Sequence, residues 1–159
     1  MKSALAALHR VLSWLLALAV AILIVPVFLQ IFSRYVGFIP RYIWTEELAR
    51  FCFIWMIMIG AMVGVREGTH FDVDLIPTLS ARATAAVKML TQFAVLIFAF
   101  VFLYYGYQWV DAGWEQTSEL ADLPMWMIFI SWPLAGLIWI LFLGEQFVRE
   151  AKVLMSKAP

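Results

Sequence analysis

The feature of this sequence that most restricts its fold is a set of four long apolar stretches without Asp, Glu, His, Lys or Arg. They cover residues 11–33, 51–65, 89–110 and 123–144, and the second can be extended back past Arg50 to Trp44. The hydrocarbon core of a bilayer is about 30 Å thick, which takes roughly 20 residues of helix at about 1.5 Å per residue. Because backbone polar groups find no water at that depth, such spans must be helical.

The sequence therefore predicts an all-α integral membrane protein, a four-helix bundle in a single membrane domain over residues 1–159. Only 14% of the residues are charged, against about 25% in typical soluble domains. The partners expected from composition are the lipid bilayer and other membrane proteins, with no nucleic acid. The predicted helices cover about residues 11–33, 44–66, 80–110 and 124–147.

Lysine and arginine residues are distributed unequally between the two sides of the predicted bundle. One side has Lys2, Arg10, Arg66, Arg82, Lys88, Arg149, Lys152 and Lys157, whereas the other has Arg34, Arg41 and, at the start of the second span, Arg50. Positively charged residues favour the cytoplasmic side of a membrane. We therefore expect both termini and the loop between the second and third spans to be cytoplasmic.

The densest polar cluster near the membrane lies at the start of the second span, where Trp44, Glu46, Glu47 and Arg50 follow one another. One interpretation is a helix start with acids in its first turn and a surface ion pair. The other is a partly desolvated contact with Arg34 or with a partner chain. Further along this span, Gly60 and Gly64 have the GxxxG spacing that permits close helix packing.

An acidic group follows the third span, at Asp111, Glu115, Glu119 and Asp122. If this segment were helical, the four carboxylates would form one stripe, and like charges at that spacing destabilise a helix. The group is interpreted either as an electrostatic docking site for a soluble partner or as a solvated external loop.

No catalytic, metal or cofactor site is predicted. His70, Asp72 and Asp74 alternate with other residues but lack a second group of ligands to complete a coordination shell, and neither His9 nor His70 is placed to ligate a haem inside the bilayer. The sequence has no P-loop and no nucleophile elbow. We therefore expect a protein that is not an enzyme.

Several motifs together resemble the small integral-membrane subunit, the Q-type or DctQ-like subunit, of tripartite ATP-independent periplasmic (TRAP) transporters. The motifs run through the chain in order: Arg34-Tyr35, Trp44-x-Glu46-Glu47-x-Ala49-Arg50, Gly60, Arg66-Glu67-Gly68-x-His70-x-x-Val73-Asp74-Leu75, and Leu123-Pro124-Met125-Trp126 with Pro133.

The resemblance implies a subunit of a bacterial inner-membrane symporter that imports organic acids, such as a C4-dicarboxylate or a sialic acid, on a sodium gradient. It implies two partners, a large multi-span transport (M-type) subunit and a periplasmic substrate-binding (P-type) protein. This chain would be the scaffold that associates with the first and helps to dock the second. The candidate interface residues are Arg34, Arg41, Trp44, Glu46, Glu47, Arg50, Gly60, Gly64, His70, Asp74, Pro124 and Trp126, and the candidate docking residues are Asp111, Glu115, Glu119 and Asp122.

Two other functions compete with this one. A small multidrug-type carrier acting as a homodimer also has four helices per chain, but such carriers are built around an acidic residue in the first span, and residues 11–33 contain none. A membrane anchor subunit of a respiratory enzyme is the second alternative. Coupled transport needs polar groups and broken helices near the middle of the membrane, so we expect the substrate and ion sites to lie in a partner.

Overall fold

The computed structural model describes residues 2–36, 42–68 and 81–155, which are mostly helical. Four helical segments are long and apolar enough to cross a membrane, which confirms the predicted all-α membrane fold. The elements are α1 (Lys2–Tyr35), α2 (Trp44–Glu67), α3 (Ala81–Ala112), the short α4 (Trp126–Phe129) and α5 (Ser131–Met155).

The helix ends follow from local sequence. Helix α1 begins well before the predicted residue 11, because the preceding residues are mainly Ala and Leu, with neither Gly nor Pro among them. Helix α2 ends at Gly68, whose φ of 71° is left-handed and whose N–H bonds to the Gly64 carbonyl, as expected for a glycine cap. Between α4 and α5 the helical bonding is interrupted at Ile130, because Pro133 has no N–H to offer the carbonyl three to four residues earlier.

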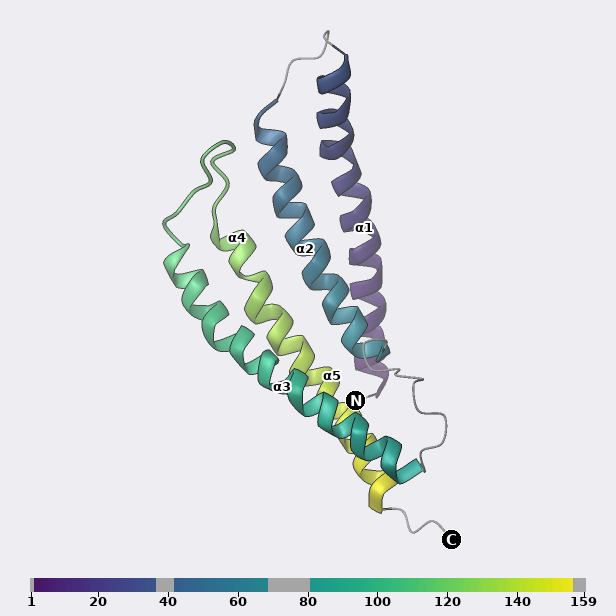
Figure 1. The fold of residues 1–159 in the computed structure, drawn as a ribbon. Coiled ribbons are helices and arrows are strands. Elements are labelled where there is room, and N and C mark those ends of the chain that lie inside the picture. Colours follow the sequence, from purple (N-terminus) through teal and green to yellow (C-terminus); the bar gives the residue numbers. More distant parts are fainter. Residues whose placement is uncertain (1, 37–41, 69–80, 156–159) are drawn as a thin grey trace.

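The helices form two hairpins that lie side by side (Figure 1). Helix α1 packs along α2, and α3 packs along α4 and α5. The hairpins meet through α2 and α5, which gives the spatial order α1, α2, α5, α3. We call the end with the start of α1, the end of α2 and the end of α5 the termini end, and the end with the α3–α4 loop (residues 113–125) the loop end.

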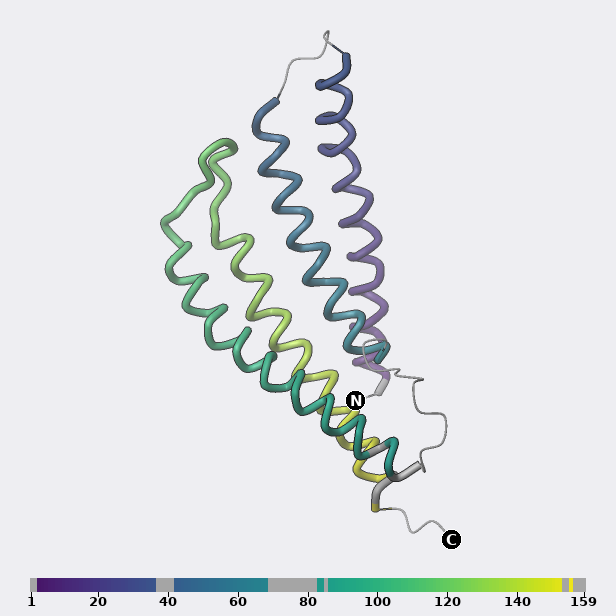
Figure 2. The backbone as a smooth tube through the Cα atoms, viewed as in Figure 1, coloured from purple at the N-terminus to yellow at the C-terminus, as the bar shows by residue number. Residues whose placement is uncertain are grey.

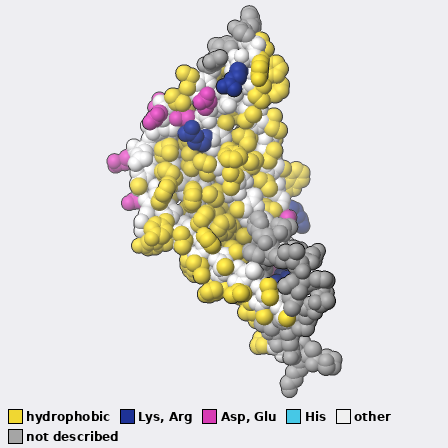
Figure 3. All heavy atoms as spheres, viewed as in Figure 1, with side chains coloured by type: hydrophobic (Ala, Val, Ile, Leu, Met, Phe, Trp, Pro, Cys, Tyr) yellow, Lys and Arg dark blue, Asp and Glu magenta, His cyan; other side chains and the backbone are white. Residues whose placement is uncertain are grey.

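The core lies where α2 and α5 meet, and Met62, Phe142 and Leu143 are fully buried there. In the most apolar windows of α1 and α3, only 6% and 11% of the residues are buried, against 39% and 44% in the α2 and α4–α5 windows. The outer helices therefore present apolar side chains to their surroundings. Figure 3 shows one face on which such side chains cover the middle and charged side chains lie around the margins.

Candidate partner interface

Glu47, in the first turn of α2, is buried against the α3–α4 loop. The residue is 6% exposed, and its Oε2 accepts a hydrogen bond from the Ala121 amide at 2.8 Å. Ser118 of the same loop lines a cavity together with Glu47. Among the described residues, no ion pair joins Glu47 to an arginine. Of the predicted charged cluster, Glu47 is therefore used inside the chain, to bind the backbone of a distant loop.

The other described charges of that cluster remain accessible to solvent. Glu46, Arg50 and Arg34 are exposed, and none of them takes part in an ion pair within the described ranges. Trp44 is 44% exposed, with its ring 6.1 Å from that of Tyr42. The loop end of the first hairpin thus presents two arginines and a glutamate whose charges are not neutralised by described residues of the chain.

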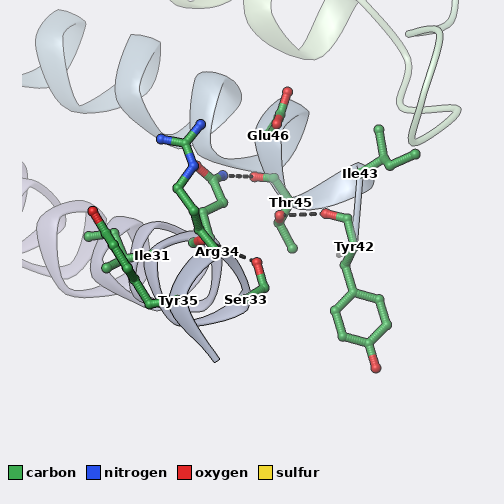
Figure 4. A pocket seen from close by; sticks show the side chains of 9 residues that line it. Ile31, Ser33, Arg34, Tyr35, Tyr42, Ile43, Thr45 and Glu46 are labelled. Carbon is green, nitrogen blue, oxygen red and sulfur yellow. Dashed lines mark hydrogen bonds between the residues drawn. The ribbon is translucent and has the colours of Figure 1, made fainter. Parts of the chain in front are cut away.

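A cavity of about 700 Å³ lies between the end of α1 and the start of α2 (Figure 4). The Gln30 side chain crosses it and donates to the Thr45 carbonyl at 2.9 Å, and the Thr45 hydroxyl donates to the Tyr42 carbonyl at 2.6 Å. Arg34 and Glu46 also line this cavity. The connection between the two helices is therefore made by uncharged groups, while the charged groups stay free.

The α3–α4 loop is a short hairpin and not a helical extension of α3. Its two limbs run next to each other (Figure 2), with a bridge between Thr117 and Pro124. The Ser118 amide donates to the Leu123 carbonyl at 2.9 Å, and the Met125 amide to the Gln116 carbonyl at 2.9 Å. Because α3 ends at Ala112, the acidic residues do not form a helical stripe. Asp111, Glu115, Glu119 and Asp122 are all exposed.

We call the contact between α2 and the α4–α5 segment the seam between the hairpins. Polar contacts close this seam at its two ends. Toward the loop end, the Trp55 Nε1 donates to the Met127 carbonyl at 2.9 Å. At the termini end, Arg66 forms an ion pair with Glu145, and its guanidinium carbon lies 5.4 Å from the centre of the Phe142 ring.

Glutamine side chains extend the contacts of the termini end to the remaining helices. The Gln146 Nε2 donates to the Val65 carbonyl at 2.8 Å, and Gln92 of α3 donates to the Gln146 Oε1 at 3.3 Å. His9 of α1 lies 3.3 Å from Glu67 of α2. Polar contacts at the termini end therefore connect all four long helices. Sequence reasoning did not identify this set, although its members share a position at the ends of the apolar stretches.

Among the glycines compared, Gly106 and Gly136 pack more closely against another helix than Gly60 of the GxxxG spacing does. A Cβ on Gly60 would meet only a Leu16 side-chain carbon, at 3.7 Å, whereas a Cβ on Gly136 would lie 2.6 Å from the Ala99 carbonyl oxygen. A Cβ on Gly106 would lie 2.8 Å from the Pro133 nitrogen. Gly64 is buried within α2. Backbone contact that requires glycine is thus made between α3 and α5.

The remaining predicted interface residues fall in two groups. Pro124 belongs to the bridge in the α3–α4 loop, and Trp126 begins α4 with its ring stacked on Trp114 at 5.5 Å. Arg41, His70 and Asp74 lie outside the described residues.

This fold and seam define a small multi-span helical membrane protein whose charged side chains lie at helix ends and in loops. The model of a family described as tripartite ATP-independent periplasmic transporters, DctQ component, matches residues 23–153. The chain therefore belongs to the DctQ family of small TRAP transporter subunits.

Individual relatives agree with this family. A predicted TRAP transporter small permease protein of Haemophilus influenzae is 34% identical over 147 residues, which cover 91% of this chain and 88% of that protein. The C4-dicarboxylate TRAP transporter small permease protein DctQ of Rhodobacter capsulatus is 31% identical over 97 residues, or 59% of this chain and 43% of that protein. The sialic acid TRAP transporter permease protein SiaT of Haemophilus influenzae is 27% identical over 110 residues, 69% of this chain but 18% of SiaT. These relatives are transporter subunits, which confirms the prediction that this chain is not an enzyme.

Proposed function

We propose that this chain is the scaffold subunit of a sodium-driven TRAP importer in a bacterial inner membrane. It holds a large transport subunit in place and contributes to the surface on which the periplasmic binding protein docks. The observation that carries the proposal is the contrast between its spans and its ends. The central parts of the spans contain no ionisable residue, whereas the polar contacts gather at helix ends and close the seam.

A chain of this kind is suited to holding another subunit in place and not to carrying solute itself. Substrate and ion sites in secondary transporters use discontinuous helices and polar groups near the middle of the membrane, and ionisable groups at that depth are costly unless they serve a function. Here, contacts at both ends of the seam hold the two hairpins to each other. Such a unit provides a fixed surface against which another subunit can move.

The proposed large partner is supported by the relative SiaT. The similarity covers only 18% of SiaT, so most of that permease lies outside the region that resembles this chain. We infer that a separate large permease subunit supplies the corresponding part for this chain. The outer helices α1 and α3, in whose apolar windows only 6% and 11% of the residues are buried, offer a surface for this subunit.

The proposed substrates are carboxylated solutes, since the relatives include C4-dicarboxylate and sialic acid transporter proteins. Selectivity among them would belong to the partners. The proposed orientation has both termini in the cytoplasm, because the termini end holds most of the Lys and Arg residues of the sequence. The loop end, with its exposed acidic residues, then faces the periplasm, where the binding protein is.

Co-purification and transport together test this function. A tagged chain, extracted in mild detergent, is expected to bring down a much larger multi-span permease in equal amount. In proteoliposomes, sodium-driven uptake of the organic acid should require both membrane chains and the binding protein. Uptake by the large subunit without this chain, or solute movement by this chain alone, would contradict the proposal.

A further inference from the structure

Glu47 lies at the start of a helix, but its hydrogen-bond partner is in a different element. An acidic side chain in the first turn commonly stabilises the free amides and the dipole of its own helix. The carboxylate of Glu47 instead bonds to the Ala121 amide, which is 74 residues away in the sequence. The residue before the helix, Ile43, provides no side-chain cap either. The buried acid in the first turn of α2 thus binds the α3–α4 loop and not its own helix.

The α3–α4 loop is shaped to receive that acid. Besides the Ala121 amide, which donates to the Glu47 carboxylate, Ser118 and Glu119 of the same loop lie next to Glu47, because all three line one cavity. A cavity of about 320 Å³ lies beside this contact, lined by Glu47 and by residues of both limbs of the loop. The loop therefore encloses a side chain that comes from the first hairpin.

The tip of the loop is fixed by contacts on both sides of Asp122. Asp122 has a φ of 50°, a left-handed conformation that aspartate, after glycine and asparagine, adopts more readily than most residues. The Leu123 amide donates to the Ser118 Oγ at 3.0 Å, and Glu47 accepts a hydrogen bond from the Ala121 amide on the other side. These two contacts tie down the backbone on both sides of the turn.

We propose that Glu47 is a positioning residue, which holds the α3–α4 loop in the conformation that the periplasmic binding protein recognises. This inference rests on the proposed function of the loop as part of the docking surface. Glu47 itself is buried and does not contact the partner. It acts by fixing the loop to the α1–α2 hairpin, so that the exposed residues of the loop are presented as one rigid unit.

The test compares Glu47→Gln with Glu150→Gln in the assembled membrane complex, reconstituted in nanodiscs. Glu150 is also a buried glutamate, 8% exposed, but it lies at the termini end, so its substitution controls for the loss of a buried charge. Two quantities are measured: hydrogen exchange of the peptide that spans residues 116–125, and the affinity for the purified binding protein. Gln keeps an oxygen that can accept from the Ala121 amide but loses the charge, and a hydrogen bond to a charged acceptor is stronger than one to a neutral acceptor. The substitution is therefore expected to change both quantities by about tenfold.

Glu47→Gln is expected to accelerate exchange in the loop and to weaken docking, with co-purification of the large subunit retained and with both quantities unchanged in Glu150→Gln. Unchanged exchange both in Glu47→Gln and in Glu47→Ala, which removes the acceptor altogether, would overturn the inference, because the side chain would then not be holding the loop.

A third variant, Glu115→Gln combined with Glu119→Gln, separates the inference from the proposed function. If it weakens docking while Glu47→Gln loosens the loop without affecting docking, the positioning role is wrong and the docking role of the loop stands. If neither variant affects docking, both the docking role and the inference that rests on it are wrong.

Discussion

The indole nitrogen of Trp55 on α2 donates a hydrogen bond of 2.9 Å to the backbone carbonyl of Met127 on α4. This bond joins the two hairpins, and it uses a carbonyl in the first turns of the fourth span, just before Pro133 interrupts the helical bonding. Because α2 and α4 belong to different hairpins, this bond contributes directly to holding the seam together.

Trp55→Phe is therefore expected to loosen the seam. The substitution keeps an aromatic side chain but removes the only donor of the indole, at a cost of about 1 kcal/mol. Thermal unfolding of the purified chain in detergent should show a lower midpoint for this variant. Trp14→Phe is the control, because Trp14 is 74% exposed on α1 and has no partner for its indole N–H among the described residues. Equal midpoints for the two variants would contradict the role of Trp55.

Gly136→Ala is expected to disrupt the contact between α3 and α5. The added methyl would lie 2.6 Å from the Ala99 carbonyl oxygen and 3.0 Å from the Leu103 nitrogen, and backbone atoms cannot move aside as a flexible side chain can. Overfilling a packed region costs about 1–3 kcal/mol. Gly144→Ala is a matched control on the same helix, since nothing lies within 4 Å of its added Cβ. It should be neutral or slightly stabilising, because alanine favours helix more than glycine does.

Arg66 and Glu145 are expected to be energetically coupled. Their side chains are 21% and 19% exposed, so removal of either one leaves the other charge poorly solvated. In a double-mutant cycle with Arg66→Met and Glu145→Gln, the double variant should lose less stability than the two single losses together, by roughly 0.5–3 kcal/mol. The pair Arg149–Glu150 serves for comparison, since Arg149 is 69% exposed, and its coupling should be close to zero. Strict additivity for Arg66 and Glu145 would show that their ion pair does not hold the seam.

The orientation of the chain is open to a labelling experiment, because Cys52 is the single cysteine of the sequence. With Cys52→Ala as background, Glu115→Cys should react with a membrane-impermeant thiol reagent added to cells with a permeabilised outer membrane. Lys152→Cys should react only after the inner membrane is broken. The opposite pattern would place the loop end in the cytoplasm and would exclude the proposed docking of the periplasmic protein there.

Local features of the fold could be predicted without coordinates. The four spans follow from uninterrupted apolar stretches, and the end of α2 follows from Gly68 after two charged residues. Helix α1 starts at Lys2, before residue 11, where the apolar stretch begins after Arg10. A helix can continue beyond the bilayer as long as its residues favour helix, so the membrane boundary and the helix boundary differ there.

Contacts between elements could not be predicted in the same way. Glu46 and Glu47 are neighbours of the same type in the same turn, yet one is exposed and the other is 6% exposed against a loop. The GxxxG spacing predicts close helix packing at Gly60. In the structure, Gly136 is instead the position where a Cβ would meet the backbone of α3. In both cases the outcome depends on which residues of a different element lie opposite.

The sequence by itself determined that the chain is a membrane protein with four helical spans and electrically neutral span centres, because the cost of burying charge or unpaired backbone in hydrocarbon depends only on local composition. Only the tertiary structure decided which polar residues close the seam and which remain free for partners. Arg66 and Glu145 are 79 residues apart, and only the pairing of the hairpins through α2 and α5 brings their charges together.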